Sequence, residues 1–270
     1  MNTTTADAAF AGSRTRGFSF HLGMTLVMAA FVFAGFGMTY WFPMATGTLR
    51  PAPPVVHVHG WVYSAWMVLL VTQAALVNAR NIALHRSLGT FGIALATAVL
   101  FMGLTITLLG LRGGMSRATQ SPDFFDAMYL SYMAILGFAI LFTLAMRQTQ
   151  RPEAHRQLML FAVLPLLPPG INRFYMVPFH LPTIPVLPLY LTLDSMALAL
   201  LVHEWRRNRR ISGLSMVGAG WCGTDSLHDR RLFPADERHG SRRTVATGRR
   251  AAWTHGRDAP SMDCKENADG

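Results

Sequence analysis

Six long apolar stretches are the feature that most limits how this 270-residue chain can fold. A helix needs roughly 20 apolar residues to cross the hydrocarbon core of a bilayer. The stretches lie at 18–41, 60–77, 88–111, 127–146, 158–177 and 185–205. Only 14% of the residues are charged, against about 25% in soluble domains. The sequence therefore predicts an all-α fold, a polytopic membrane bundle of six transmembrane helices.

Charge separates this apolar body from the end of the chain. Residues 211–270 hold 9 Lys/Arg and 8 Asp/Glu, and they contain no apolar stretch of spanning length. We expect a short cytoplasmic segment at 1–17, the membrane domain at 18–210 and a polar, disordered cytoplasmic tail at 211–270. The abrupt change at residue 211 leaves two explanations open, a native regulatory tail and a last span lost through a shifted reading frame or a truncation.

Arginines in the short connecting segments predict the orientation, because such residues are enriched on the cytoplasmic side. Eleven lie on one predicted side: Arg14, Arg16, Arg80, Arg86, Arg147, Arg151, Arg156, Arg206, Arg207, Arg209 and Arg210. Four lie on the other: Arg50, Arg112, Arg117 and Arg173. Both termini are therefore expected in the cytoplasm. The same bias accounts for the net charge of +10, so we expect a lipid bilayer and no nucleic acid as a partner.

The fifth stretch is expected to be kinked or broken. Pro165, Pro168 and Pro169 each lack the backbone N–H that a continuous helix needs. A broken helix can line a binding site, but it can also simply bend.

Buried polar residues suggest a site between the second, fifth and sixth spans. His59, Trp66 and Gln73 follow one another at steps of seven, so they share one face of the second span from its outer end to about mid-membrane. Asp194 lies about ten residues inside the sixth span, and Arg173 is its expected ion-pair partner. These five residues could bind or pass a small solute or a proton, because polar groups at this depth are costly unless they are satisfied. They could equally fix the packing of helices in a structural or assembly subunit.

Histidines at both ends of the bundle suggest a second interpretation. His59 and His180 are predicted at one end, and His85 and His155 at the other. Histidines from facing helices can hold b-type haem, whereas a histidine beside an arginine often contacts lipid headgroups. The sequence contains no complete catalytic motif. Both cysteines lie in the tail, so we expect no metal site in the body.

Three motifs carry a resemblance. His57-Val-His59-Gly60 precedes Trp66 and Gln73, and His85-Arg86-Ser-Leu-Gly is echoed 70 residues later by His155-Arg156-Gln-Leu-Met. This echo suggests two duplicated hairpins. Over about residues 20–210 the chain resembles a family of bacterial multi-pass inner-membrane proteins that has no established activity. The resemblance implies a bundle in the bacterial cytoplasmic membrane, with recurrent polar positions at His59, Trp66, Gln73, His85, His155 and Asp194.

A fainter resemblance, to ascorbate-reducible b-type cytochromes, implies haem on histidines. The chain departs from the first family after about residue 210, where a further span would be expected.

Overall fold

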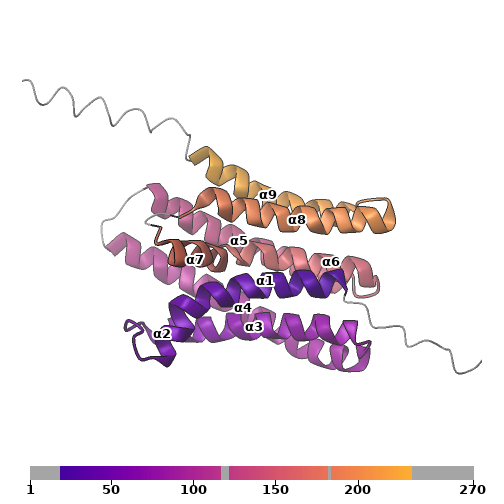
Figure 1. Cartoon of the computed structure of the whole chain (residues 1–270), viewed down its shortest axis with the longest axis horizontal. Coiled ribbons are helices and arrows are strands. Elements are labelled where there is room, and N and C mark those ends of the chain that lie inside the picture. Colours follow the sequence, from indigo (N-terminus) through magenta and orange to yellow (C-terminus); the bar gives the residue numbers. More distant parts are fainter. Residues whose placement is uncertain (1–18, 117–121, 182–183, 233–270) are drawn as a thin grey trace, which may run out of the picture. The chain divides into compact units, whose positions relative to one another are not determined.

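The computed structural model describes residues 19–116, 122–181 and 184–232, and every regular element in these ranges is a helix. Figure 1 shows the helices running side by side, with the grey traces marking the residues left out of the description. The helices are α1 Phe20–Phe36, a π-helical turn Gly37–Trp41, α2 Phe42–Ala45, α3 Pro54–Asn78, α4 Ile82–Ser116, α5 Pro122–Arg147, α6 Pro152–Val163, a 3₁₀ turn Leu164–Leu166, α7 Pro168–Phe179, α8 Val186–Asn208 and α9 Gly213–Leu232.

The apolar helices make the chain a multi-pass integral membrane protein. Five are long and apolar enough to cross a bilayer: Phe20–Ala45, Pro54–Asn78, Ile82–Gly110, Met128–Arg147 and Val186–Asn208. A sixth span results if the bent pair Pro152–Leu166 and Pro168–Phe179 is counted as one. Each of the six matches one predicted stretch, and the all-α prediction is confirmed.

The expected break in the fifth span is present. The chain passes from α6 into the 3₁₀ turn at Leu164 and resumes as α7 at Pro168, with a bend of 51°. Prolines cannot donate to the preceding turn of a helix, so the backbone bonds lapse where they cluster. The bend leaves α7 only 12 residues long.

Helical hairpins and one very close crossing build the bundle. Tight turns join α3 to α4 and α5 to α6, and α4 also packs against α5. Helix α1 packs against α3 and α7. At its crossing with α7, a Cβ placed on Gly35 would overlap the carbonyl oxygen of Gly170. The missing side chain lets the two backbones approach, as small residues commonly do in membrane bundles.

Helix α9 corrects the expected boundary of the polar tail. Residues 213–232 form a helix that begins beside the end of α8 and runs back along it (Figure 1). Ser215 and Cys222 are buried, at 2% and 8% exposure, and a Cβ on Gly218 would lie 2.6 Å from the ring of Phe161 in α6. Ser215, Gly218 and Cys222 therefore face the bundle, so the tail expected to be disordered from residue 211 begins instead with this helix. Residues 233–270 lie outside the described part of the chain.

Candidate functional site

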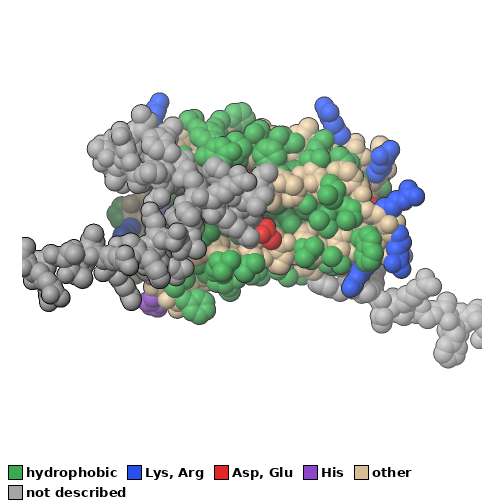
Figure 2. Space-filling view, turned by 90° about the horizontal axis from the view of Figure 1, so that it is seen from above, with side chains coloured by type: hydrophobic (Ala, Val, Ile, Leu, Met, Phe, Trp, Pro, Cys, Tyr) green, Lys and Arg blue, Asp and Glu red, His purple; other side chains and the backbone are tan. Residues whose placement is uncertain are grey.

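Three segments that were predicted on one side of the membrane meet at one end of the bundle, together with the start of α1. The Ser19 backbone N–H donates to Asn78 Oδ1 at 3.1 Å, which joins the start of α1 to the end of α3. Glu153 at the start of α6 pairs with Arg207 near the end of α8, at 3.0 Å. We call this the arginine-rich end; its described arginines are Arg80, Arg86, Arg147, Arg151, Arg156, Arg206, Arg207, Arg209 and Arg210. Figure 2 shows cationic side chains gathered at one end of an apolar flank.

His85 and His155 face each other at the arginine-rich end. Each is the fourth residue of its helix, α4 or α6, and each follows a tight turn from the preceding helix. Their ring centroids lie 6.5 Å apart, with the ring planes at 77°. The sequence echo therefore has a structural counterpart, because the two histidines occupy equivalent positions in the α3–α4 and α5–α6 hairpins and their rings lie close together.

Gln73 holds His85 in place. Its amide fits when the nitrogen faces His85 and the oxygen faces Gly89: the nitrogen then donates to the His85 carbonyl at 3.2 Å and to His85 Nδ1, while the oxygen accepts from the Gly89 N–H at 3.2 Å. Gln73 lies in the last two turns of α3, rather than at mid-membrane as expected. It thus joins α3 to the His-Arg-Ser-Leu-Gly motif.

His155 has an equivalent anchor. Its Nδ1 lies 2.8 Å from the carbonyl oxygen of Ala145 in the last turn of α5, which also accepts from the backbone N–H of Gln148 at 3.1 Å. A carbonyl only accepts, so His155 Nδ1 carries the proton and its Nε2 is an acceptor. His85 is the reverse, because its Nδ1 accepts from Gln73 and its Nε2 therefore carries the proton. In their neutral forms the two imidazoles therefore carry their protons on different nitrogens.

An aromatic layer separates this end from the other. Trp66 lies at the midpoint of α3, is 3% exposed and packs edge-on against Phe138 and Phe142 of α5, with centroids 5.4 and 5.8 Å away. Its indole N–H has no hydrogen-bond partner among the described residues. His59 and Gln73 lie on opposite sides of this layer, about 21 Å apart along the helix at 1.5 Å per residue. The predicted five-residue site is thus spread over both ends of the bundle.

The other end holds His59 and Arg173. The imidazole of His59 lies against the ring of Tyr63, with centroids 4.2 Å apart, and within electrostatic range of Arg173. Its Nδ1 is buried and has no partner in the described ranges. Arg173 donates to the carbonyl of Pro169 at 2.8 Å and lies 4.6 Å over the ring of Phe36. A cation and an imidazole with an unused nitrogen can together bind an anionic or carboxylate group.

The expected ion pair between Arg173 and Asp194 is wrong. The guanidinium of Arg173 is engaged by the Pro169 carbonyl and the Phe36 ring instead. Asp194 is half-buried on α8. His180 is exposed just after α7, with its Nδ1 3.3 Å from the Pro178 carbonyl, and within the described ranges it makes no ring contact with His59. Of the two expected histidine pairs, only His85 and His155 come together.

Sequence reasoning missed a second polar cluster at the arginine-rich end. The rings of His21 and His203 lie 5.1 Å apart, and His203 stacks on Phe20 at 4.0 Å. Buried Gln157 donates to the Leu200 carbonyl at 2.9 Å, which fastens α6 to α8. One signal was available, because His21 lies near the start of the first apolar stretch and His203 near the end of the sixth.

Comparison with protein-family models, with curated proteins and with solved structures finds no match to this chain.

Proposed function

We propose that this is a proton-responsive protein of the bacterial cytoplasmic membrane, with the arginine-rich end in the cytoplasm. Histidine is the side chain that changes charge between about pH 5 and 8. The proton site is the His85–His155 pair. The observation that carries the proposal is that the two neutral imidazoles carry their protons on different nitrogens, one fixed by Gln73 and the other by the Ala145 carbonyl.

Protonation of His85 would work against the Gln73 contact. A proton on His85 Nδ1 places one donor opposite another, the amide N–H₂ of Gln73. The amide must then turn around, and it gives up its bonds to the His85 carbonyl and the Gly89 N–H. The charged or titratable groups nearest to His85 are His155 on α6 and Arg86 on α4. We therefore expect the contact between α3 and α4 to weaken at acidic pH.

The opposite end is the proposed solute site. His59 and Arg173 offer a positive charge and an unused imidazole nitrogen, which suit a small anionic solute, and Asp194 belongs to the same proposal as a polar group on α8. The aromatic layer of Trp66, Phe138 and Phe142 favours binding over open passage, because a polar solute cannot cross a dry aromatic layer without breaking its hydration.

Hydrogen exchange of the purified protein in nanodiscs tests the proton site. Peptides covering residues 73–89 should lose protection between pH 8 and pH 5.5, after correction for intrinsic exchange rates. Gln73→Glu should reverse this trend, because a carboxylate accepts from the charged imidazole. Gly89→Ala is the matched control, since a Cβ there meets nothing within 4 Å. A protection pattern that is independent of pH in both the wild type and Gln73→Glu would contradict the proposal.

A membrane redox role with b-type haem is the second candidate. Two imidazoles 6.5 Å apart suit opposite sides of one metal ion, given metal–nitrogen bonds of about 2.0–2.1 Å. The Nδ1–carbonyl contact of His155 is also typical of a metal ligand. His85 fits less well, because Gln73 leaves the proton on the Nε2 that would have to bind iron.

A reduced-minus-oxidised absorption spectrum of the purified protein separates the two candidates. A b-type band that disappears in His85→Ala and His155→Ala would favour haem. If the spectrum has no such band and the exchange is independent of pH, a structural or assembly subunit becomes the better explanation.

A further inference from the structure

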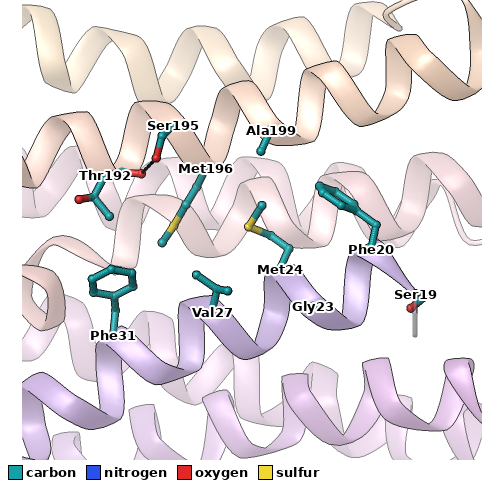
Figure 3. Close-up of a pocket in the computed structure, with 10 residues that line it drawn as sticks. All are labelled: Ser19, Phe20, Gly23, Met24, Val27, Phe31, Thr192, Ser195, Met196 and Ala199. Atoms are coloured by element: carbon teal, nitrogen blue, oxygen red, sulfur yellow. Dashed lines mark hydrogen bonds between the residues drawn. The ribbon is translucent and has the colours of Figure 1, made fainter. Parts of the chain in front are cut away.

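An open groove runs between α1 and α8 on the flank of the bundle (Figure 3). Its volume is about 560 Å³. Helix α1 packs against α3 and α7, and α8 packs against α7. Because α7 is short and crosses α1 at Gly35, no described residue fills the space between α1 and α8 closer to the arginine-rich end. The lining residues are Ser19, Phe20, Gly23, Met24, Val27, Phe31, Thr192, Ser195, Met196 and Ala199.

The wall of this groove suits an apolar occupant. Phe31, Val27, Met24 and Phe20 project from α1 toward α8 in Figure 3. The Ser19 hydroxyl accepts from the Leu22 N–H at 3.3 Å, and the hydroxyl groups on α8 are satisfied within α8 and α7. The Ser195 hydroxyl donates to the Thr192 carbonyl at 2.8 Å; the Thr192 hydroxyl donates to the Pro188 carbonyl at 2.8 Å and meets the Tyr175 hydroxyl at 2.9 Å. A polar solute would find no free partner here, whereas an acyl chain needs none.

The arginine-rich end of the groove has a different character. His203 and Arg206 continue the α8 face of Ala199 at steps of four and three. The ring of Phe20 stacks on His203 at 4.0 Å, which places this histidine at the mouth of the groove. His203 Nε2 is buried and has no hydrogen-bond partner among the described residues, so the ring closes the inner side of the mouth. Arg206 is exposed and forms no ion pair within the described ranges, whereas the adjacent Arg207 is paired with Glu153.

We propose that the groove between α1 and α8 binds one anionic phospholipid, with an acyl chain between the helices and the phosphate at Arg206. A basic mouth above an apolar groove between membrane helices complements an acidic lipid. A second copy of this chain is a poorer occupant. Copies inserted in the same orientation would place two arginine-rich ends side by side, where like charges repel.

Thermal unfolding in detergent tests this proposal, with phosphatidylglycerol and phosphatidylcholine of identical acyl chains as probes. A ligand that binds only the folded state raises the unfolding temperature. We expect phosphatidylglycerol to raise the Tm by on the order of 5 °C more than phosphatidylcholine. Arg206→Gln should abolish this difference. Arg147→Gln should keep it, because that exposed arginine ends α5 and lies outside the groove.

A second pair of variants tests the acyl part of the site. Ala199→Phe fills the groove and should remove the phosphatidylglycerol effect, whereas Leu198→Phe changes the adjacent residue, which is 60% exposed and not part of the lining, and should preserve it. Equal shifts with both lipids, or equal losses in Arg206→Gln and Arg147→Gln, would overturn the proposal. A dimer that Ala199→Phe converts to monomer would also overturn it, and would assign the groove to a second copy.

Discussion

At the scale of single residues, the structure explains positions that look unremarkable in the sequence. Gly35 and Gly170 belong to different spans and to no motif, yet they allow the closest helix crossing in the described part of the bundle. The Cβ that Gly35 lacks would overlap backbone, which cannot move aside as a flexible side chain can.

We therefore predict that Gly35→Ala destabilises the protein by about 1–3 kcal/mol, the usual cost of overpacking. Gly37→Ala, two residues along, should leave the stability nearly unchanged, because a Cβ there meets nothing within 4 Å. Thermal unfolding of both variants in the same detergent measures the difference. If the two midpoints fall equally, helix propensity or membrane insertion, rather than the crossing, determines the effect.

The sequence predicted at which end of the bundle the arginines lie more reliably than it predicted which side chains contact one another. The three described arginine-bearing segments that it grouped do meet at one end, because the charge pattern follows the order of the spans; Arg14 and Arg16 lie outside the described residues. Partners depend on the rotation of each helix and on its packing, which the sequence leaves open. For this reason Arg173 turns to Pro169 and Phe36 instead of Asp194, and Gln73 meets His85 near the end of α3.

At the scale of elements, hydropathy and proline placement predicted the spans and the bend between α6 and α7. Helix α9 was missed because its sequence is rich in glycine and polar residues, and it is not apolar enough to be counted among the spans. Its packing depends on glycines, because a residue without a side chain lets the neighbouring helix approach closely. A Cβ on Gly137 of α5 would overlap the indole of Trp221, and Gly218 faces Phe161 closely.

Removal of α9 should therefore destabilise the bundle. We predict that a chain ending at Arg210 unfolds at a lower temperature than one ending at Leu232, since the first exposes Phe161 and the α5 surface around Gly137. Gly137→Ala should lower the midpoint in the longer chain and have little effect in the shorter one. Gly220→Ala, where a Cβ meets nothing within 4 Å, is the control. Identical midpoints for the two chain lengths would show that α9 contributes no stability.

At the scale of the whole molecule, orientation in the membrane is the principal prediction. Of the described arginines up to residue 210, nine lie at the arginine-rich end, and Arg50, Arg112 and Arg173 belong to the opposite side. Reporter fusions after Arg80 and after Arg151 should therefore give cytoplasmic signals, and a fusion at Thr48 an external one. An external signal at Arg151 would contradict the proposed orientation. A fourth fusion, after Leu232, determines on which side α9 ends.

The aromatic layer of Trp66, Phe138 and Phe142 also has an electrical consequence. A transmembrane voltage falls mainly across the driest part of a protein, and a unit charge that crosses the full drop gains about 2.3 kcal/mol per 100 mV. A proton that reaches His85 from the arginine-rich end stops short of this layer and crosses almost none of the drop. The occupancy of the His85–His155 pair should therefore follow the acidity of one compartment and remain nearly indifferent to the membrane potential, whereas a charge bound near His59 on the far side would report the acidity of the other.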